Sequence, residues 1–152
     1  MNAKTNDAIA ILTADHREVK ELFEKYEALS DRAASKKKNL AEEICTALTL
    51  HAMVEEEIFY PAVRAAVKDA DDLMDEAVVE HASAKDLIAQ IMEMDPGDDL
   101  YDAKVKVLSE QIEHHVGEEE GDMFPKVRKG GVDLVALGEE MKAFKATLAP
   151  VA

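Results

Sequence analysis

The sequence predicts an all-α protein, an up-down-up-down four-helix bundle with an additional C-terminal helix. Aromatic residues make up only 5% of the chain, and helix-forming residues such as Ala, Leu, Glu, Lys and Met dominate. Apolar residues recur at alternating spacings of three and four, the pattern of helices with one buried face. Four such stripes are separated by short polar breaks, and short connections favour antiparallel neighbours.

The four bundle helices are expected where these stripes occur. In chain order the stripes contain Ile9, Leu12, Val19, Phe23 and Tyr26; Ile44, Leu48, Ile58 and Ala62; Met74, Val78, Ile88 and Met92; and Val105, Leu108, Ile112 and Met123. Polar segments at 30–35, 68–72 and 95–98 separate them, and Gly130-Gly131 ends the fourth.

A shorter amphipathic helix is expected from Val132 to Leu148, with Leu137 and Met141 among its apolar residues. The simplest interpretation is a helix that covers one edge or end of the bundle, and the alternative is a helix that binds a partner protein. We therefore expect a single domain over residues 1–152, with the bundle at about 7–128 and the last helix at about 132–148.

Composition excludes several classes of function. The chain has 152 residues and a formal charge of -15, which would repel phosphate backbones, so nucleic acid is not expected as a partner. Cys45 is the only cysteine, so an intrachain disulfide and a cysteine-rich zinc site are ruled out, and a reducing compartment fits. Neither a signal-like N-terminus nor a long apolar run is present. We expect a cytoplasmic protein that does not bind membranes.

One motif occurs twice in the chain at matched separations. In each copy an acid-histidine pair is followed, one helix later, by a second histidine with Glu at +4 and +5, an aromatic residue at +9 and Pro at +10. The shared residues are Asp15, His16, His51, Glu55, Glu56, Tyr60 and Pro61 in the first copy, and Glu80, His81, His115, Glu119, Glu120, Phe124 and Pro125 in the second.

The repeated histidines should lie at one level of the bundle. Two antiparallel helices rise equally per residue, so residues equidistant from their connecting turn lie at the same height. The midpoints between positions 16 and 51, 51 and 81, and 81 and 115 all fall in or next to the three polar breaks. Four imidazoles are therefore expected to face one another.

The repeat predicts a dinuclear metal centre. A single His-x-x-x-Glu pair is a common surface contact, but here both pairs lie on apolar stripes. Burying unpaired carboxylates costs several kcal/mol each, and facing carboxylates raise each other's pKa, whereas a bound cation removes both conflicts. The expected metal ligands are His16, His51, Glu55, His81, His115 and Glu119.

The sequence leaves the roles of several residues near these ligands open. Glu56 and Glu120 form a solvated acidic face, orient the imidazoles or supply an extra ligand. His114 lies about 100° of helix rotation from its neighbouring histidine, so we expect solvent exposure or support of a ligand. Lys20 and Lys85 are either plain surface cations or counter-charges to the acidic site.

The ligand types favour iron. Two imidazoles and one carboxylate per ion are typical of non-haem iron with open coordination positions, so iron is favoured over zinc. Magnesium and calcium prefer shells made only of oxygen.

The order His, His-x-x-x-Glu, His, His-x-x-x-Glu resembles the signature of the hemerythrin-like, HHE cation-binding domain family, over about residues 9–127. The resemblance implies two iron ions joined by an oxo or hydroxo bridge. The ligands that it implies are His16 and His51 for one ion, His81 and His115 for the other, and Glu55 and Glu119 as bridges.

The chain departs from the oxygen-carrying members of that family. Those proteins have a further histidine four residues after the third-helix ligand, where this chain has Lys85, and a carboxylate five residues after the last histidine, which makes Glu120 a rival to Glu119. Relatives with such departures resemble proteins that decompose peroxide or that sense iron, oxygen or nitric oxide. We therefore expect a small diatomic molecule or peroxide as ligand, and either an enzyme, a sensor or reservoir without turnover, or a bundle that its metal ions hold together.

Overall fold

The computed structural model describes residues 7–30 and 32–148, and this part of the chain is helical without a strand. The bundle helices are α1 (Ala8–Glu27), α2 (Ala34–Val54), α4 (Asp71–Met92) and α5 (Tyr101–Glu118). Shorter elements are the π-helical segments η2 (Glu55–Phe59) and η4 (Glu119–Met123), the 3-10 turn η3 (Lys68–Ala70), and the helices α3 (Tyr60–Ala66), α6 (Phe124–Lys129) and α7 (Leu134–Leu148).

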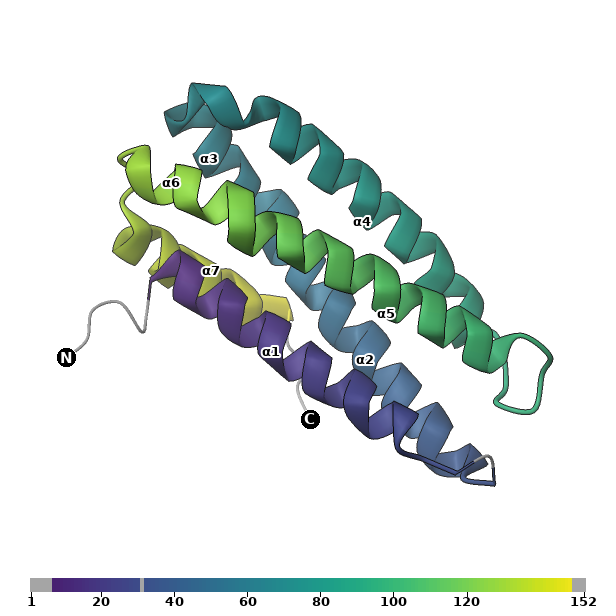
Figure 1. The fold of residues 1–152 in the computed structure, drawn as a ribbon. Coiled ribbons are helices and arrows are strands. Elements are labelled where there is room, and N and C mark those ends of the chain that lie inside the picture. Colours follow the sequence, from purple (N-terminus) through teal and green to yellow (C-terminus); the bar gives the residue numbers. More distant parts are fainter. Residues whose placement is uncertain (1–6, 31, 149–152) are drawn as a thin grey trace.

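Four long rods build the bundle, as the sequence predicts. The second rod runs from α2 through η2 into α3, and the fourth runs from α5 through η4 into α6. In Figure 1, α1 and α2 lie side by side, α4 and α5 do the same, and each rod runs antiparallel to the next along the chain. The fold is therefore an up-down-up-down four-helix bundle with one additional helix.

The two π-helical segments differ from the regular helices that the spacing predicts. Each begins at the glutamate that follows a site histidine by four residues, and a proline in the next turn, Pro61 or Pro125, comes after it. Proline has no N–H to donate to the preceding turn and its ring clashes there, so the regular ladder is interrupted. Widened turns of this kind are common at functional sites.

Two apolar clusters fill the bundle. One lies toward α3, α6 and α7, with Phe59 and Met74 fully buried, and the other lies toward the α1–α2 and α4–α5 connections, with Ile44 and Leu108 fully buried. The predicted site histidines belong to neither cluster. They lie between the two, so the polar site is sealed by apolar side chains along the bundle axis.

Helix α7 lies alongside α1 at the end of the bundle that holds α3 and α6 (Figure 1). It begins at Leu134, because the side chain of Asp133 accepts a hydrogen bond from the Ala136 N–H and caps the first turn. Leu137 and Met141 bury their side chains against α1, α2 and η2. This packing agrees with the expected covering helix. None of the described helices is long and apolar enough to cross a membrane.

Candidate metal centre

The structure brings all six predicted ligands together. Each imidazole comes from a different rod, and each glutamate begins a π-helical segment, Glu55 in η2 and Glu119 in η4. The six side chains are buried, and the two glutamates are exposed by 1% or less. They fall into two overlapping groups, within which the ligand atoms lie no more than 4.8 Å apart: His16, His51, Glu55 and Glu119, and His81, His115, Glu55 and Glu119.

The matched heights explain this convergence. The ring centroids of His16 and His51 lie 5.0 Å apart, and those of His81 and His115 lie 4.7 Å apart. Both glutamates belong to both groups, so they stand between the two histidine pairs. The arrangement has the approximate two-fold symmetry that the repeated motif implies.

Each of the four imidazoles makes a hydrogen bond to a carboxylate through Nδ1, the ring nitrogen turned away from the centre. The contacts to Nδ1 are Glu120 Oε2 to His16 at 2.7 Å, Asp15 Oδ2 to His51 at 2.9 Å, Glu56 Oε2 to His81 at 2.6 Å, and Glu80 Oε1 to His115 at 2.6 Å. An ionised carboxylate only accepts hydrogen bonds, so Nδ1–H donates in every pair. Each ring is thereby fixed with Nε2 turned toward the centre, the tautomer that a metal ligand needs.

These contacts match one of the alternatives for Glu56 and Glu120, the orientation of imidazoles. Both orient an imidazole of the opposite half of the motif, His81 and His16 respectively. The acids that precede each opening histidine, Asp15 and Glu80, were not predicted to take part. The sequence could have predicted this role, because an acidic residue precedes the opening histidine in both copies of the motif.

Several atoms at the centre have no hydrogen-bond partner. They are His16 Nε2, His51 Nε2, Glu55 Oε2 and Glu119 Oε1, one from each member of the first group, and His16 Nε2 and Glu119 Oε1 lie 3.0 Å apart without the geometry of a hydrogen bond. In the second group the two Nε2 atoms of His81 and His115 face each other at 3.1 Å. Buried polar atoms without partners are rare in proteins, and an ion is one of the things that accounts for them. The donor set therefore fits metal cations.

The two halves differ in one aromatic residue. The Tyr60 ring stacks on His81, with ring centroids 5.6 Å apart, and the Phe124 ring stacks on His16 at 5.9 Å. The buried Tyr60 hydroxyl donates to Glu119 Oε2 at 2.6 Å and lies 3.2 Å from Glu55 Oε1. The repeated aromatic position was visible in the sequence, but this hydroxyl makes the site asymmetric.

Buried charges shift the ionisation of the site. Burial alone would lower the pKa of His51, but the charge of Glu55 and the hydrogen bond that His51 donates to Asp15 raise it to about 10. Burial also opposes the charged form of His115, and hydrogen bonds to Glu119 and Glu55 raise its pKa to about 11. Burial would raise the pKa of Glu55, yet the surrounding histidines hold it well below its usual value. Without metal, protons on His51 and His115 thus balance the charge of Glu55.

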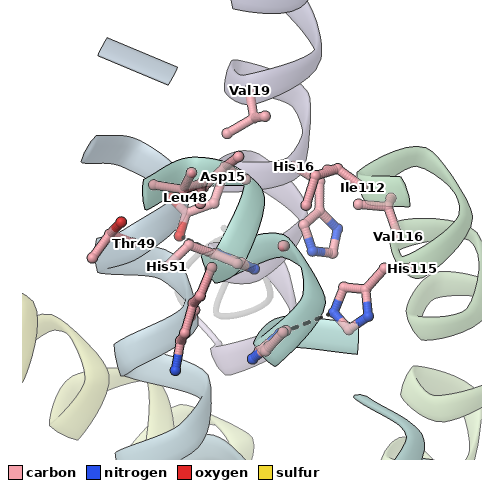
Figure 2. A pocket seen from close by; sticks show the side chains of 14 residues that line it. Asp15, His16, Val19, Leu48, Thr49, His51, Ile112, His115 and Val116 are labelled. Carbon is pink, nitrogen blue, oxygen red and sulfur yellow. Dashed lines mark hydrogen bonds and ion pairs between the residues drawn. The ribbon is translucent and has the colours of Figure 1, made fainter. Parts of the chain in front are cut away.

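A small cavity of about 30 Å³ adjoins the four histidines. Figure 2 shows His16, His51 and His115 on its walls, with the apolar residues Val19 and Leu48 beside them. A cavity needs roughly 10–15 Å³ to hold one water. The space therefore fits a molecule of about two non-hydrogen atoms next to the imidazoles.

The other residues whose roles the sequence leaves open lie outside the two ligand groups. His114 is 69% exposed and lies within 4 Å of the carboxylates of Glu80 and Glu118. Lys85 forms an ion pair with Glu56, with 2.8 Å between Nζ and Oε1, so it is a counter-charge and also lines the cavity. Lys20 is exposed and lines a groove between α1 and α5.

Comparison with known proteins agrees with this site. Residues 7–127 match the family model of the hemerythrin HHE cation-binding domain. The crystal structure of an HHE cation-binding domain-containing protein from Mycobacterium kansasii superposes with a TM-score of 0.78, is 26% identical, and the match covers 93% of this chain and 86% of that chain.

The chain is also similar to part of a curated protein named DNA nickase from Nostoc sp. (strain PCC 7120 / SAG 25.82 / UTEX 2576). The two are 30% identical over 118 residues, which is 78% of this chain but 32% of that protein. The chain thus spans about a third of this relative's length. Since the family match covers most of the chain, and the paired His and Glu groups fit its cation-binding role, the chain belongs to the hemerythrin HHE cation-binding domain family.

Proposed function

We propose that the protein holds two iron ions, with His16 and His51 on one and His81 and His115 on the other. Glu55 and Glu119 would be ligands that both ions share. The observation that carries this proposal is the overlap of the two ligand groups, because both glutamates lie within reach of both histidine pairs. One ion in the first group would account for its four unpartnered atoms, and a second ion in the other group would hold the His81 and His115 Nε2 atoms, which face each other at 3.1 Å.

The ligand set supports iron. Each half offers two imidazoles and shared carboxylates, a combination that suits non-haem iron and leaves coordination positions open. Zinc in structural sites prefers four closed ligands, commonly cysteines, and Cys45 is buried in the second apolar cluster, away from the site.

The cavity supports binding of a small ligand at this centre. Its walls combine the four imidazoles with apolar side chains, and the Tyr60 hydroxyl faces the glutamates from the opposite apolar cluster. Ligand access is therefore expected on the Val19 and Leu48 side. Dioxygen, peroxide and nitric oxide have the size that the space admits.

We propose peroxide decomposition as the activity. When bound, a pair of iron ions supplies open coordination positions and the electrons exchanged with peroxide. The protein's contribution is to fix the four imidazoles through their Nδ1–H donors and to enclose the ligand among apolar walls that limit water. In this scheme Tyr60 is the hydroxyl that holds the bridging carboxylates in place.

The test is turnover by protein that contains a measured amount of iron. Steady release of dioxygen from hydrogen peroxide, in proportion to iron content and abolished by His115→Ala, is the expected result. Iron-loaded protein that is bleached by one equivalent of peroxide without turnover would contradict the enzymatic proposal.

A sensor without turnover is the second candidate, and one contact favours it. Lys145 in α7 is bonded to Asp15, which holds His51. A change at the metal centre therefore has a path to the C-terminal helix. A ligand-dependent change in α7 without turnover would select this function.

The charge of the chain argues against direct contact with nucleic acid. A formal charge of -15 opposes binding to phosphate backbones. The name of the Nostoc relative belongs to a protein about three times as long as the matched segment. We therefore propose a small molecule, not nucleic acid, as the partner of this domain.

A further inference from the structure

Two of the four carboxylates that hold the imidazoles are themselves held by a lysine. Asp15 Oδ1 accepts a hydrogen bond from Lys145 Nζ at 2.8 Å, and Glu56 Oε1 accepts one from Lys85 Nζ at 2.8 Å. In each case the second carboxylate oxygen accepts the Nδ1–H of a site histidine. Each half of the centre thus contains a series of contacts from lysine to carboxylate to imidazole.

The two lysines come from different parts of the fold. Lys85 is in α4, four residues after His81, so its contact lies within the bundle. Lys145 is in α7, beyond residue 127, where the family match ends. The contact between Lys145 and Asp15 therefore ties the half that contains His51 to an element outside the matched domain. We call the series Lys145, Asp15 and His51 the α7 link.

Packing places Lys145 firmly at this position. Met141, one turn earlier in α7, is fully buried in the apolar cluster where α7 packs on α1 and the π-helical segment η2. The helix therefore cannot shift without disturbing that packing. The Asp15 side chain is 14% exposed, whereas that of Lys145 is 39% exposed at the edge of a cleft between α1 and α2. The cation is thus more exposed than the carboxylate that it holds.

The chemistry of a carboxylate between two donors explains the effect on the metal ligand. Asp15 cannot rotate about its side chain without losing either Lys145 or His51. Its hydrogen bond to Nδ1 in turn fixes the ring orientation and leaves Nε2 as the ligand atom. Partners that orient ligands in this way typically change metal affinity by 10- to 100-fold when they are removed.

We propose that Lys145 is a positioning residue of the metal centre, and that α7 sets the geometry of His51 through Asp15. The inference rests on the proposed two-ion centre. It predicts that α7 acts on one half of the centre only, because the other half has its own lysine within the bundle.

The experiment compares Lys145→Met, Lys145→Arg, Lys85→Met and Lys129→Met in the full chain. Lys129 is an exposed lysine at the end of α6, so its substitution controls for the lost charge. Anaerobic titration with Fe²⁺ against a chelator gives the affinity for each equivalent of metal, and the visible spectrum after oxidation reports ligand geometry. Thermal unfolding of the metal-free variants measures any purely structural effect.

The expected result is that Lys145→Met lowers the affinity for one equivalent of Fe²⁺ about 10-fold and alters the visible spectrum. The affinity for the second equivalent should stay within about 2-fold of that of the original chain. Lys145→Arg should restore the affinity for the first equivalent, and Lys129→Met should change neither affinity. Lys85→Met should weaken the other equivalent.

Unchanged affinity and spectrum in Lys145→Met would overturn the inference, even if the metal-free variant is less stable. So would equal weakening of both equivalents, because the α7 link reaches only His51. A starting chain that binds fewer than two ions would instead contradict the proposed centre, so the two failures are distinguishable.

Discussion

The Tyr60 hydroxyl lies 2.6 Å from Glu119 Oε2, although the two residues belong to different halves of the repeated motif. This contact crosses the centre and has no hydroxyl counterpart at Phe124, which stacks on His16. Burial, followed by the charges of Glu55 and Glu119, raises the pKa of Tyr60 far above its usual value, so the hydroxyl stays protonated and donates.

Tyr60→Phe is therefore expected to disturb the glutamates without removing a predicted ligand. The lost donor leaves a buried carboxylate oxygen without its partner, which should destabilise the metal-free protein by about 1–3 kcal/mol and alter the spectrum of the iron-loaded form. Chemical denaturation and visible spectroscopy measure the two effects. The control is Tyr26→Phe, which removes a hydroxyl bonded to Asp102 far from the site. Identical iron spectra for Tyr60→Phe and the original chain would show that this hydroxyl does not position the bridging carboxylates.

The histidine substitutions separate ligands from neighbours. His51→Ala and His115→Ala should each lower bound metal and its affinity, because each removes one buried Nε2 donor from a different half. His114→Ala should have much less effect, since that side chain is 69% exposed. Metal analysis after dialysis measures the difference, and an equal loss of metal in all three variants would show that the distinction between His114 and His115 is wrong.

Stability of the metal-free protein should depend on pH in a defined direction. Folding raises the pKa of His51 to about 10 and that of His115 to about 11, from 6.5, so the stability they contribute is complete below pH 6.5 and is lost as the pH rises through 10 to 11. The pKa of Glu55 is lowered from 4.5, so its contribution is lost as the pH falls below that value.

Metal-bound protein should behave differently, because the metal replaces protons on the imidazoles. The difference in thermal midpoint between the metal-bound and metal-free forms should thus widen from pH 6.5 toward 10, and acid should release the metal. A metal-free protein whose thermal midpoint is constant from pH 6.5 to 10, or a chelator that removes metal without lowering the midpoint, would refute the balance of buried charges.

Lys85→His tests the position at which oxygen carriers have a further histidine. Lys85 lines the cavity beside the imidazoles, so a histidine there should close one exchangeable position, slow the reaction with peroxide and lengthen the life of an oxygenated form. Lys85→Met is the matched control, because it also loses the ion pair with Glu56 but adds no imidazole. The idea fails if Lys85→His reacts with azide, peroxide and dioxygen in the same way as Lys85→Met, or if the original chain binds oxygen reversibly without oxidation.

Much of this fold follows from local sequence patterns. The apolar stripes and polar breaks predict four antiparallel rods, and equal rise per residue predicts that the histidines at 16, 51, 81 and 115 face one another. Both inferences depend only on regular helix geometry. The π-helical segments could not be predicted in this way, because they depend on how Pro61 and Pro125 are accommodated by neighbouring turns.

The partners of the imidazoles needed the structure for a different reason. Glu56 lies off the apolar stripe of its helix, and only the packing of α4 beside it shows that its carboxylate reaches His81. Lys145 and Asp15 are 130 residues apart, and their contact depends on the direction in which α7 folds back. Long-range contacts of this kind leave no periodic signal in the chain.

The central claim is that two metal ions share Glu55 and Glu119, and metal analysis combined with visible spectroscopy of aerobically purified protein tests it most directly. The account predicts two iron per chain and the absorption of an oxo-bridged pair, both reduced in His51→Ala and in His115→Ala. A single ion per chain at saturation, or two ions without any spectroscopic sign of a bridge, would contradict it.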